Sequence, residues 1–130
     1  VFFLNSSLTE EDISDGLGYT VFVGEKISPS RFRQADEDLD LGWVSGTRAT
    51  LRNVGWAVNH EIREKAKRQD LQEPIRKVSP LEVGGFSSWH SQGAQFLFGD
   101  GRVQFLGIFT TPEVLQRLGN RADGQLVSGY

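Results

Sequence analysis

The sequence contains no cysteine and no methionine, and it has only two histidines. Without thiols the chain cannot form a disulfide or a thiolate metal site. Two histidines are too few for a closed zinc site, which needs three or four nitrogen or sulfur ligands. The absence of cysteine fits either side of a membrane, so it does not decide the compartment.

Long apolar runs and an excess of positive charge are also missing. No stretch approaches the roughly 20 apolar residues of a membrane-spanning helix, and the short apolar run Val1–Leu4 is no signal peptide. The net charge is −3, so the chain lacks the basic surface that binds phosphate backbones, and we expect no nucleic-acid partner. Because the chain starts at Val1 without methionine, we expect it to be a processed product or a piece of a longer protein.

What the sequence does contain fits one domain over residues 1–130, long enough to bury a core. The pattern predicts an α+β domain that is mainly an antiparallel β-sheet with a short C-terminal helix. Thr111 as N-cap and Pro112 at the first position start that helix, and Leu115 and Leu118 give it a buried stripe. Residues 19–25 are almost continuously apolar, so we expect a central strand covered on both faces.

The clearest β signal lies in residues 93–106, where Asp100-Gly101 separates two apolar runs. Asp-Gly between strands is typical of a type I′ hairpin turn, which needs a positive φ at both central residues. With these two residues at the centre of the turn, four apolar side chains are predicted to share one buried face: Phe96, Phe98, Val103 and Phe105.

The segment from His60 to Gln72 is highly charged and rich in helix-forming residues. It has almost no apolar face, with Ile62 and Leu71 as the main exceptions. Such a segment is either a solvated helix or a surface loop, and we favour the loop.

Two stretches also resemble a known family. His90 is followed, after nine residues, by Asp100-Gly101, which resembles the C-terminal H-x9-D-G signature of a large bacterial family of prepilin-type proteins related to type II secretion pseudopilins. Residues 13–25 resemble its I-T-D-G-x-S-N-T…V-G-E stretch, with Gly18-Tyr19 in place of Ser-Asn, and residues 121–127 are similar to its R-A-G-G-E-V-V end. The matching motif residues are Asp15, Gly16, Thr20, Gly24, Glu25, His90, Asp100 and Gly101.

This resemblance implies the extracytoplasmic C-terminal domain of a pilin-like or pseudopilin-like protein. It also implies an upstream apolar helix, absent from this chain, that anchors the full-length protein in the membrane and packs against the sheet. The expected role is then non-enzymatic: a structural or interaction subunit, periplasmic or on the cell surface. Its expected partners are the protein subunits of a secretion or pilus-like assembly and further copies of the chain.

One candidate metal site lies in the acidic stretch that contains Asp36, Asp38 and Asp40. Alternating carboxylates can offer oxygen ligands to calcium. Counted from Asp36, however, Leu41 and Thr47 stand where an EF-hand loop needs glycine and glutamate. We therefore favour a solvated acidic loop and expect no cofactor.

His90 and Asp100 invite an acid–base interpretation. Ten residues of extended chain separate their Cα atoms by roughly 30 Å, so we expect Asp100 to serve the turn and His90 to form a local hydrogen bond. His90 could also belong to a recognition surface with Trp89 and Trp43. That surface makes an extracellular carbohydrate- or metal-ion-binding module the alternative function.

An enzyme would need acid–base groups that converge in a cleft. The candidates for such a group are Asp15, Glu25, His90 and Asp100. Because the sequence gives no reason to bring them together, we expect no enzymatic activity.

Overall fold

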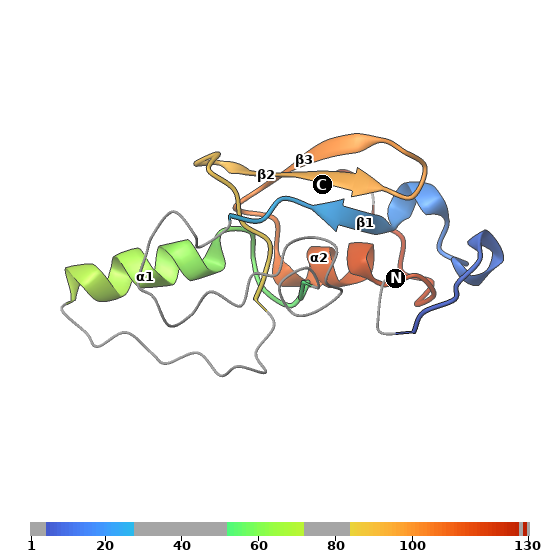
Figure 1. Ribbon diagram of the computed structural model, residues 1–130, viewed down its shortest axis with the longest axis horizontal. Coiled ribbons are helices and arrows are strands. Elements are labelled where there is room, and N and C mark those ends of the chain that lie inside the picture. The colour runs from blue at the N-terminus through green and yellow to red at the C-terminus, as the bar shows by residue number, and fades with distance from the viewer. Residues whose placement is uncertain (1–4, 28–51, 72–83, 128, 130) are drawn as a thin grey trace.

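The computed structural model describes residues 5–27, 52–71, 84–127 and 129. In chain order the described part contains two 3-10 helices, η1 (Glu10–Asp12) and η2 (Leu17–Tyr19), and the strand β1 (Val21–Gly24). The helix α1 (His60–Asp70), the strands β2 (Gly93–Phe98) and β3 (Val103–Gly107) and the helix α2 (Pro112–Gly119) follow. The three strands form one antiparallel sheet above α2 (Figure 1), which confirms the predicted α+β class.

The core lies between one face of the sheet and α2. Strand β2 alternates buried and exposed residues from Ala94 to Phe98, as expected for a strand with one covered face. The buried cluster joins this face to α2, and its members are Val21, Val58, Ala94, Phe96, Phe98, Leu106, Leu115 and Leu118. Helix α2 starts as predicted, because the Thr111 hydroxyl accepts a hydrogen bond from the Val114 N–H at 3.4 Å and Pro112 takes its first position.

Strand β1 corrects the prediction of a central strand covered on both faces. The central strand is β2, and β1 pairs only with β2 within the described part of the chain. Val21 is buried whereas Val23 is 54% exposed. The continuous apolar run does not form one regular strand. Its first residue, Tyr19, ends η2, and a register irregularity lies between Val21 and Val23.

The hairpin between β2 and β3 differs from its prediction by one residue. Leu97 pairs with Val103 and Phe96 with Gln104, so the loop contains Gly99, Asp100 and Gly101 instead of two residues. Among these only Gly101 has a positive φ, at 86°, and the Gly101 N–H donates to the Phe98 carbonyl at 3.0 Å. This is the three-residue hairpin loop whose glycine takes the left-handed position.

The shift in register turns the side chains of β3 over. Because side chains alternate with a period of two, a change of one residue exchanges the two faces of a strand. Leu106 is therefore buried at 1% exposure, whereas Val103 and Phe105 are 61% and 42% exposed. The prediction that Val103 and Phe105 belong to the core is wrong.

The segment from His60 to Asp70 is a helix, so the favoured loop is also wrong. Its alanine, glutamate, lysine and arginine residues lose little side-chain freedom in a helix, which favours helix formation without a broad apolar face. Its first residue, His60, stacks on Trp56 with ring centroids 4.6 Å apart. None of the helices in the described ranges is both long and apolar enough to span a membrane.

Candidate functional site

Asp15 and its neighbours join the beginning of the chain to its end. The Asp15 carboxylate is buried and accepts hydrogen bonds from the N–H groups of Asp123, at 2.8 Å, and Gly124, at 2.9 Å. The Asp15 N–H donates to the Arg121 carbonyl at 3.1 Å. One carboxylate therefore holds together residues near the start of the chain and residues near its end.

Gly16 and Thr20 shape the turn that follows. Gly16 has a φ of 92°, where a Cβ is strained. The fully buried Thr20 donates its hydroxyl to the Gly16 carbonyl at 3.0 Å, and the Thr20 carbonyl accepts from the Gly99 N–H at 3.0 Å. The turn therefore holds η2 against the tip of the β2–β3 hairpin.

Asp100 bonds locally at that tip. Its Oδ1 accepts from the Arg102 N–H at 2.9 Å, and its Oδ2 lies 3.9 Å from Arg102 Nε. The Arg102 guanidinium donates to the Gly18 carbonyl at 2.6 Å. A shallow pocket lined in part by Tyr19 and Gln104 lies here, and neither His90 nor Glu25 is among its lining residues.

Gly24 makes room for two aromatic rings. A Cβ at this position would lie 2.6 Å from the Phe86 ring and 2.7 Å from the Phe96 ring, closer than real contacts allow. Those rings pack edge to face with centroids 4.9 Å apart. Gly24 is therefore required by close packing rather than by its backbone angles.

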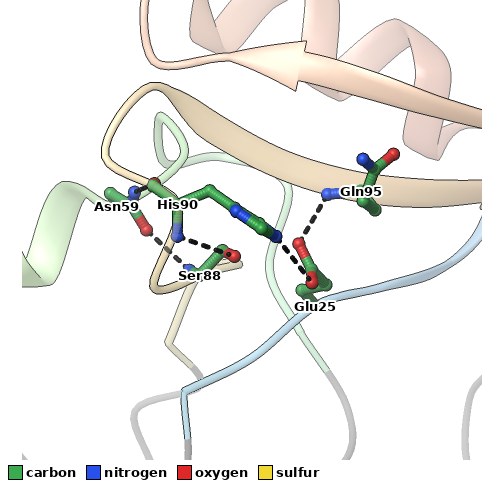
Figure 2. A network of polar contacts seen from close by, with 5 residues as sticks. All are labelled: Glu25, Asn59, Ser88, His90 and Gln95. Carbon is green, nitrogen blue, oxygen red and sulfur yellow. Dashed lines mark hydrogen bonds and ion pairs between the residues drawn. The ribbon is translucent and has the colours of Figure 1, made fainter.

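Glu25 and His90, 65 positions apart in the chain, meet at the end of β1 (Figure 2). His90 Nε2 lies 3.7 Å from Glu25 Oε1. Glu25 Oε2 accepts from the Gln95 backbone N–H at 2.7 Å, while the Glu25 N–H donates to the Gln95 carbonyl at 3.2 Å. The carboxylate takes the place that the Glu25 carbonyl would have in a regular ladder, because that carbonyl accepts from Ser87 N–H at 3.0 Å.

Asn59 holds the backbone on which His90 sits (Figure 2). It is buried, has a left-handed φ of 62°, and precedes α1. Its Oδ1 accepts from the Ser88 N–H at 2.7 Å, and its Nδ2 donates to the His90 carbonyl at 3.1 Å. The Ser88 hydroxyl accepts from the His90 N–H at 3.3 Å. The backbone of this segment is therefore tied to the start of α1, and the His90 imidazole points away from these bonds toward Glu25.

The His90 and Glu25 side chains are 59% and 37% exposed, and the imidazole faces the edge of the Phe105 ring at a centroid distance of 6.3 Å. An exposed carboxylate beside an imidazole can bind hydroxyl or cationic groups, but both side chains remain open to solvent among the described residues. Asp15 and Asp100 make their contacts at other places, so the four acid–base candidates do not converge.

Sequence reasoning missed the roles of Asn59 and Gln95. Their roles depend on contacts across the fold, and the one local signal was asparagine ahead of a charged segment, since asparagine tolerates the left-handed conformation. Trp89, predicted with His90 as part of a recognition surface, is 63% exposed.

Four other sequence candidates, Trp43 and the calcium candidates Asp36, Asp38 and Asp40, lie outside the described residues. Within the ranges that the structure describes, no group of three or more histidine, aspartate and glutamate side chains could hold a metal ion.

Comparison with known proteins gives a family but no function. No curated protein and no solved structure matches the chain. Residues 1–112 match a family, labelled SBP_bac_10, that is described as a protein of unknown function (DUF1559). Because this match covers most of the sequence, the chain belongs to the DUF1559 family.

Proposed function

We propose that this protein is a non-enzymatic structural or interaction subunit of the pseudopilin kind. In the full-length protein an upstream apolar helix anchors it, and this domain is displayed outside the cytoplasmic membrane as part of a secretion or pilus-like assembly. Its partners are the other protein subunits of that assembly and further copies of itself.

The observation that carries the proposal is that the motif residues hold separate segments of the fold together. Asp15 ties the two ends of the chain together, Gly24 admits two rings, and Glu25 closes the pairing of β1 with β2. Residues that hold backbone segments in place, rather than converge in a cleft, favour a scaffold that presents a surface.

Cell fractionation of the parent protein, followed by mass spectrometry of its mature N-terminus, tests this function. We expect a membrane-bound product whose processed N-terminus begins a long apolar helix. A soluble cytoplasmic product that starts near Val1 would overturn the proposal.

A carbohydrate-binding module is the second candidate, favoured by aromatic exposure beside polar groups. Trp89 is 63% exposed next to His90, and Phe105 is 42% exposed. Aromatic faces stack on the apolar faces of sugars, while Glu25 and His90 offer hydrogen bonds to hydroxyls. Affinity electrophoresis in soluble polysaccharides tests it: Trp89→Ala should abolish the retardation, and unretarded wild-type protein would exclude this function.

A further inference from the structure

Strand β3 forms an edge of the sheet whose backbone is open. Among the described residues β3 pairs with β2 alone, and Figure 1 shows it as the outermost strand. At the start of the pairing, the Phe98 N–H donates to the Arg102 carbonyl at 2.9 Å. Because the bonding of antiparallel strands alternates, the N–H and C=O groups of Val103 and Phe105 point away from β2. The described part of the chain provides no hydrogen-bond partner for these groups.

The β3 edge also lacks the features that protect exposed edges. Such strands usually carry a charged residue, a proline or a bulge, and β3 has the sequence Val-Gln-Phe-Leu-Gly in regular register. The opposite edge of the sheet is partly covered, because just beyond β1 the Ser87 N–H donates to the Glu25 carbonyl at 3.0 Å. A helix packed on a face of the sheet would leave the β3 edge open, since the edge groups point within the plane of the sheet.

We propose that the β3 edge pairs with the β3 edge of a second copy of this chain, antiparallel about a two-fold axis at Gln104. Val103 then lies opposite Phe105 of the copy, and each residue donates its N–H to the carbonyl of the other. Because the axis makes the relation mutual, this register gives a partner to every N–H and C=O group that Val103 and Phe105 leave open. It also sets an aromatic ring beside a β-branched side chain, which is a favourable cross-strand pair.

The neighbouring register of two such edges is less favourable. A two-fold axis at Phe105 would pair Val103 with Gly107 of the copy. The Gly107 carbonyl already accepts from the Thr110 N–H at 3.0 Å, so it is not available to Val103. The axis at Gln104 avoids this conflict.

An exposed ring beyond β3 favours a second copy over an unrelated strand. The axis at Gln104 places Ile108 of the copy opposite Asp100, which brings the next residue, Phe109, to the tip of the β2–β3 hairpin. Phe109 is 82% exposed, and the tip has the shallow pocket lined in part by Tyr19. A strand from another protein could bond to the edge but would not supply this ring.

The pairing of two five-residue strands makes a small interface. The association is therefore weak, with a Kd in the micromolar to millimolar range. Its biological meaning rests on the assembly role proposed above, in which further copies of the chain are partners.

Sedimentation equilibrium of the full chain tests the pairing. Between about 10 µM and about 1 mM, we expect the mean mass of the wild type to rise with concentration. Val103→Pro removes an outward N–H without breaking a bond to β2, and proline is tolerated at the first residue of a strand. It should raise Kd at least about tenfold. Val103→Thr is the matched control, because it keeps the N–H and the shape of this exposed side chain, and it should change Kd less than about threefold.

Disulfide formation tests the register. The chain has no cysteine, so Gln104→Cys introduces its single thiol. The axis places the two thiols opposite each other, on Cα atoms about 4.5 Å apart, which is within the range of a disulfide. Mild oxidation should therefore link the Gln104→Cys chain into a dimer. Leu97→Cys is the matched control: Leu97 is exposed on the central strand, where edge pairing keeps its thiol away from that of the copy, so this chain should stay monomeric.

Three outcomes would overturn the proposal: a wild type that stays monomeric, a Val103→Pro chain that associates as well as the wild type, or a Leu97→Cys chain that links as readily as Gln104→Cys. The last would mean that the faces of two sheets meet instead of their edges. If circular dichroism shows that Val103→Pro unfolds, the two cysteine variants decide the question. Each of these outcomes leaves the fractionation test of the proposed function unaffected, so the two failures are distinguishable.

Discussion

Asp15 shows at the scale of one residue how a buried carboxylate can serve structure. It has two oxygens and two backbone donors, the N–H groups of Asp123 and Gly124. Asp15→Asn should lower the free energy of unfolding by about 2 kcal/mol, because the amide NH2 turns a donor toward a donor and the charge of the acceptor is lost. Urea unfolding at neutral pH measures this loss.

Glu11→Gln is the matched control for Asp15→Asn, since Glu11 is an exposed acid in the nearby η1. It should change the free energy of unfolding by less than about 0.5 kcal/mol. Equal stability of the Asp15 and Glu11 variants would contradict the role assigned to Asp15.

Asn59 combines an uncommon backbone conformation with two side-chain hydrogen bonds. Asn59→Ala removes both bonds and puts alanine at a φ of 62°, so we expect a loss of about 3 kcal/mol. Asn59→Gly loses the same two hydrogen bonds, but glycine adopts a φ of 62° without strain. It should therefore destabilise the protein by about 1 kcal/mol less than Asn59→Ala. Chemical denaturation of both variants separates the two effects, and two equal losses would show that the backbone angle carries no strain.

At the scale of elements, the β2–β3 hairpin depends on Gly101. Gly101→Val places a β-branched residue at a φ of 86° and should lower the free energy of unfolding by about 2 kcal/mol. Gly101→Asn should lose less, because asparagine adopts this region more readily. Thermal unfolding compares the three proteins, and an unchanged melting temperature in Gly101→Val would refute the turn assignment.

The same hairpin shows what a dipeptide signal can decide. Asp-Gly correctly predicts a turn between two strands, but two loop lengths satisfy it. The three-residue loop closes because Phe98 N–H donates to the Arg102 carbonyl at 2.9 Å and Gly101 alone takes the left-handed angle. The choice between the loops sets which side chains of β3 reach the core.

At the scale of the whole molecule, two surface carboxylates make stability depend on acid pH. Hydrogen bonds from the Thr9 N–H and hydroxyl hold the pKa of Asp12 below its ordinary value. The Glu113 N–H and the Thr111 hydroxyl lower the pKa of Glu113 in the same way. A pKa lowered by folding contributes stability above the unfolded pKa, which is near 4, and that stability is lost as pH falls through the folded pKa.

We therefore expect the melting temperature to fall as the pH drops below about 4. Asp12→Asn cannot titrate, so its melting temperature should fall by less over the same range. Differential scanning calorimetry at several pH values provides the test, with Glu10→Gln as the exposed control. A parallel fall in the wild type and Asp12→Asn would contradict the contribution of Asp12.

Local patterns in the sequence predict the α+β class, helix α2 and the position of the β2–β3 turn, because caps, turn residues and periodicity act over a few neighbours. They also provide the resemblance that singles out Asp15, Glu25 and His90. Helix propensity by itself favours a helix over residues 60–70. The prediction of a loop gave more weight to the missing apolar face, and it is wrong.

Only the tertiary structure decides the order of the strands, the register of β3 and the partners of the motif residues. The contact between Glu25 and His90, the capture of the chain end by Asp15 and the outward position of Val103 all depend on segments that are distant in sequence. A shift of one residue in register exchanges the two faces of a strand. Packing against the core selects between the two registers, and the residues near Asp100 do not by themselves predict that packing.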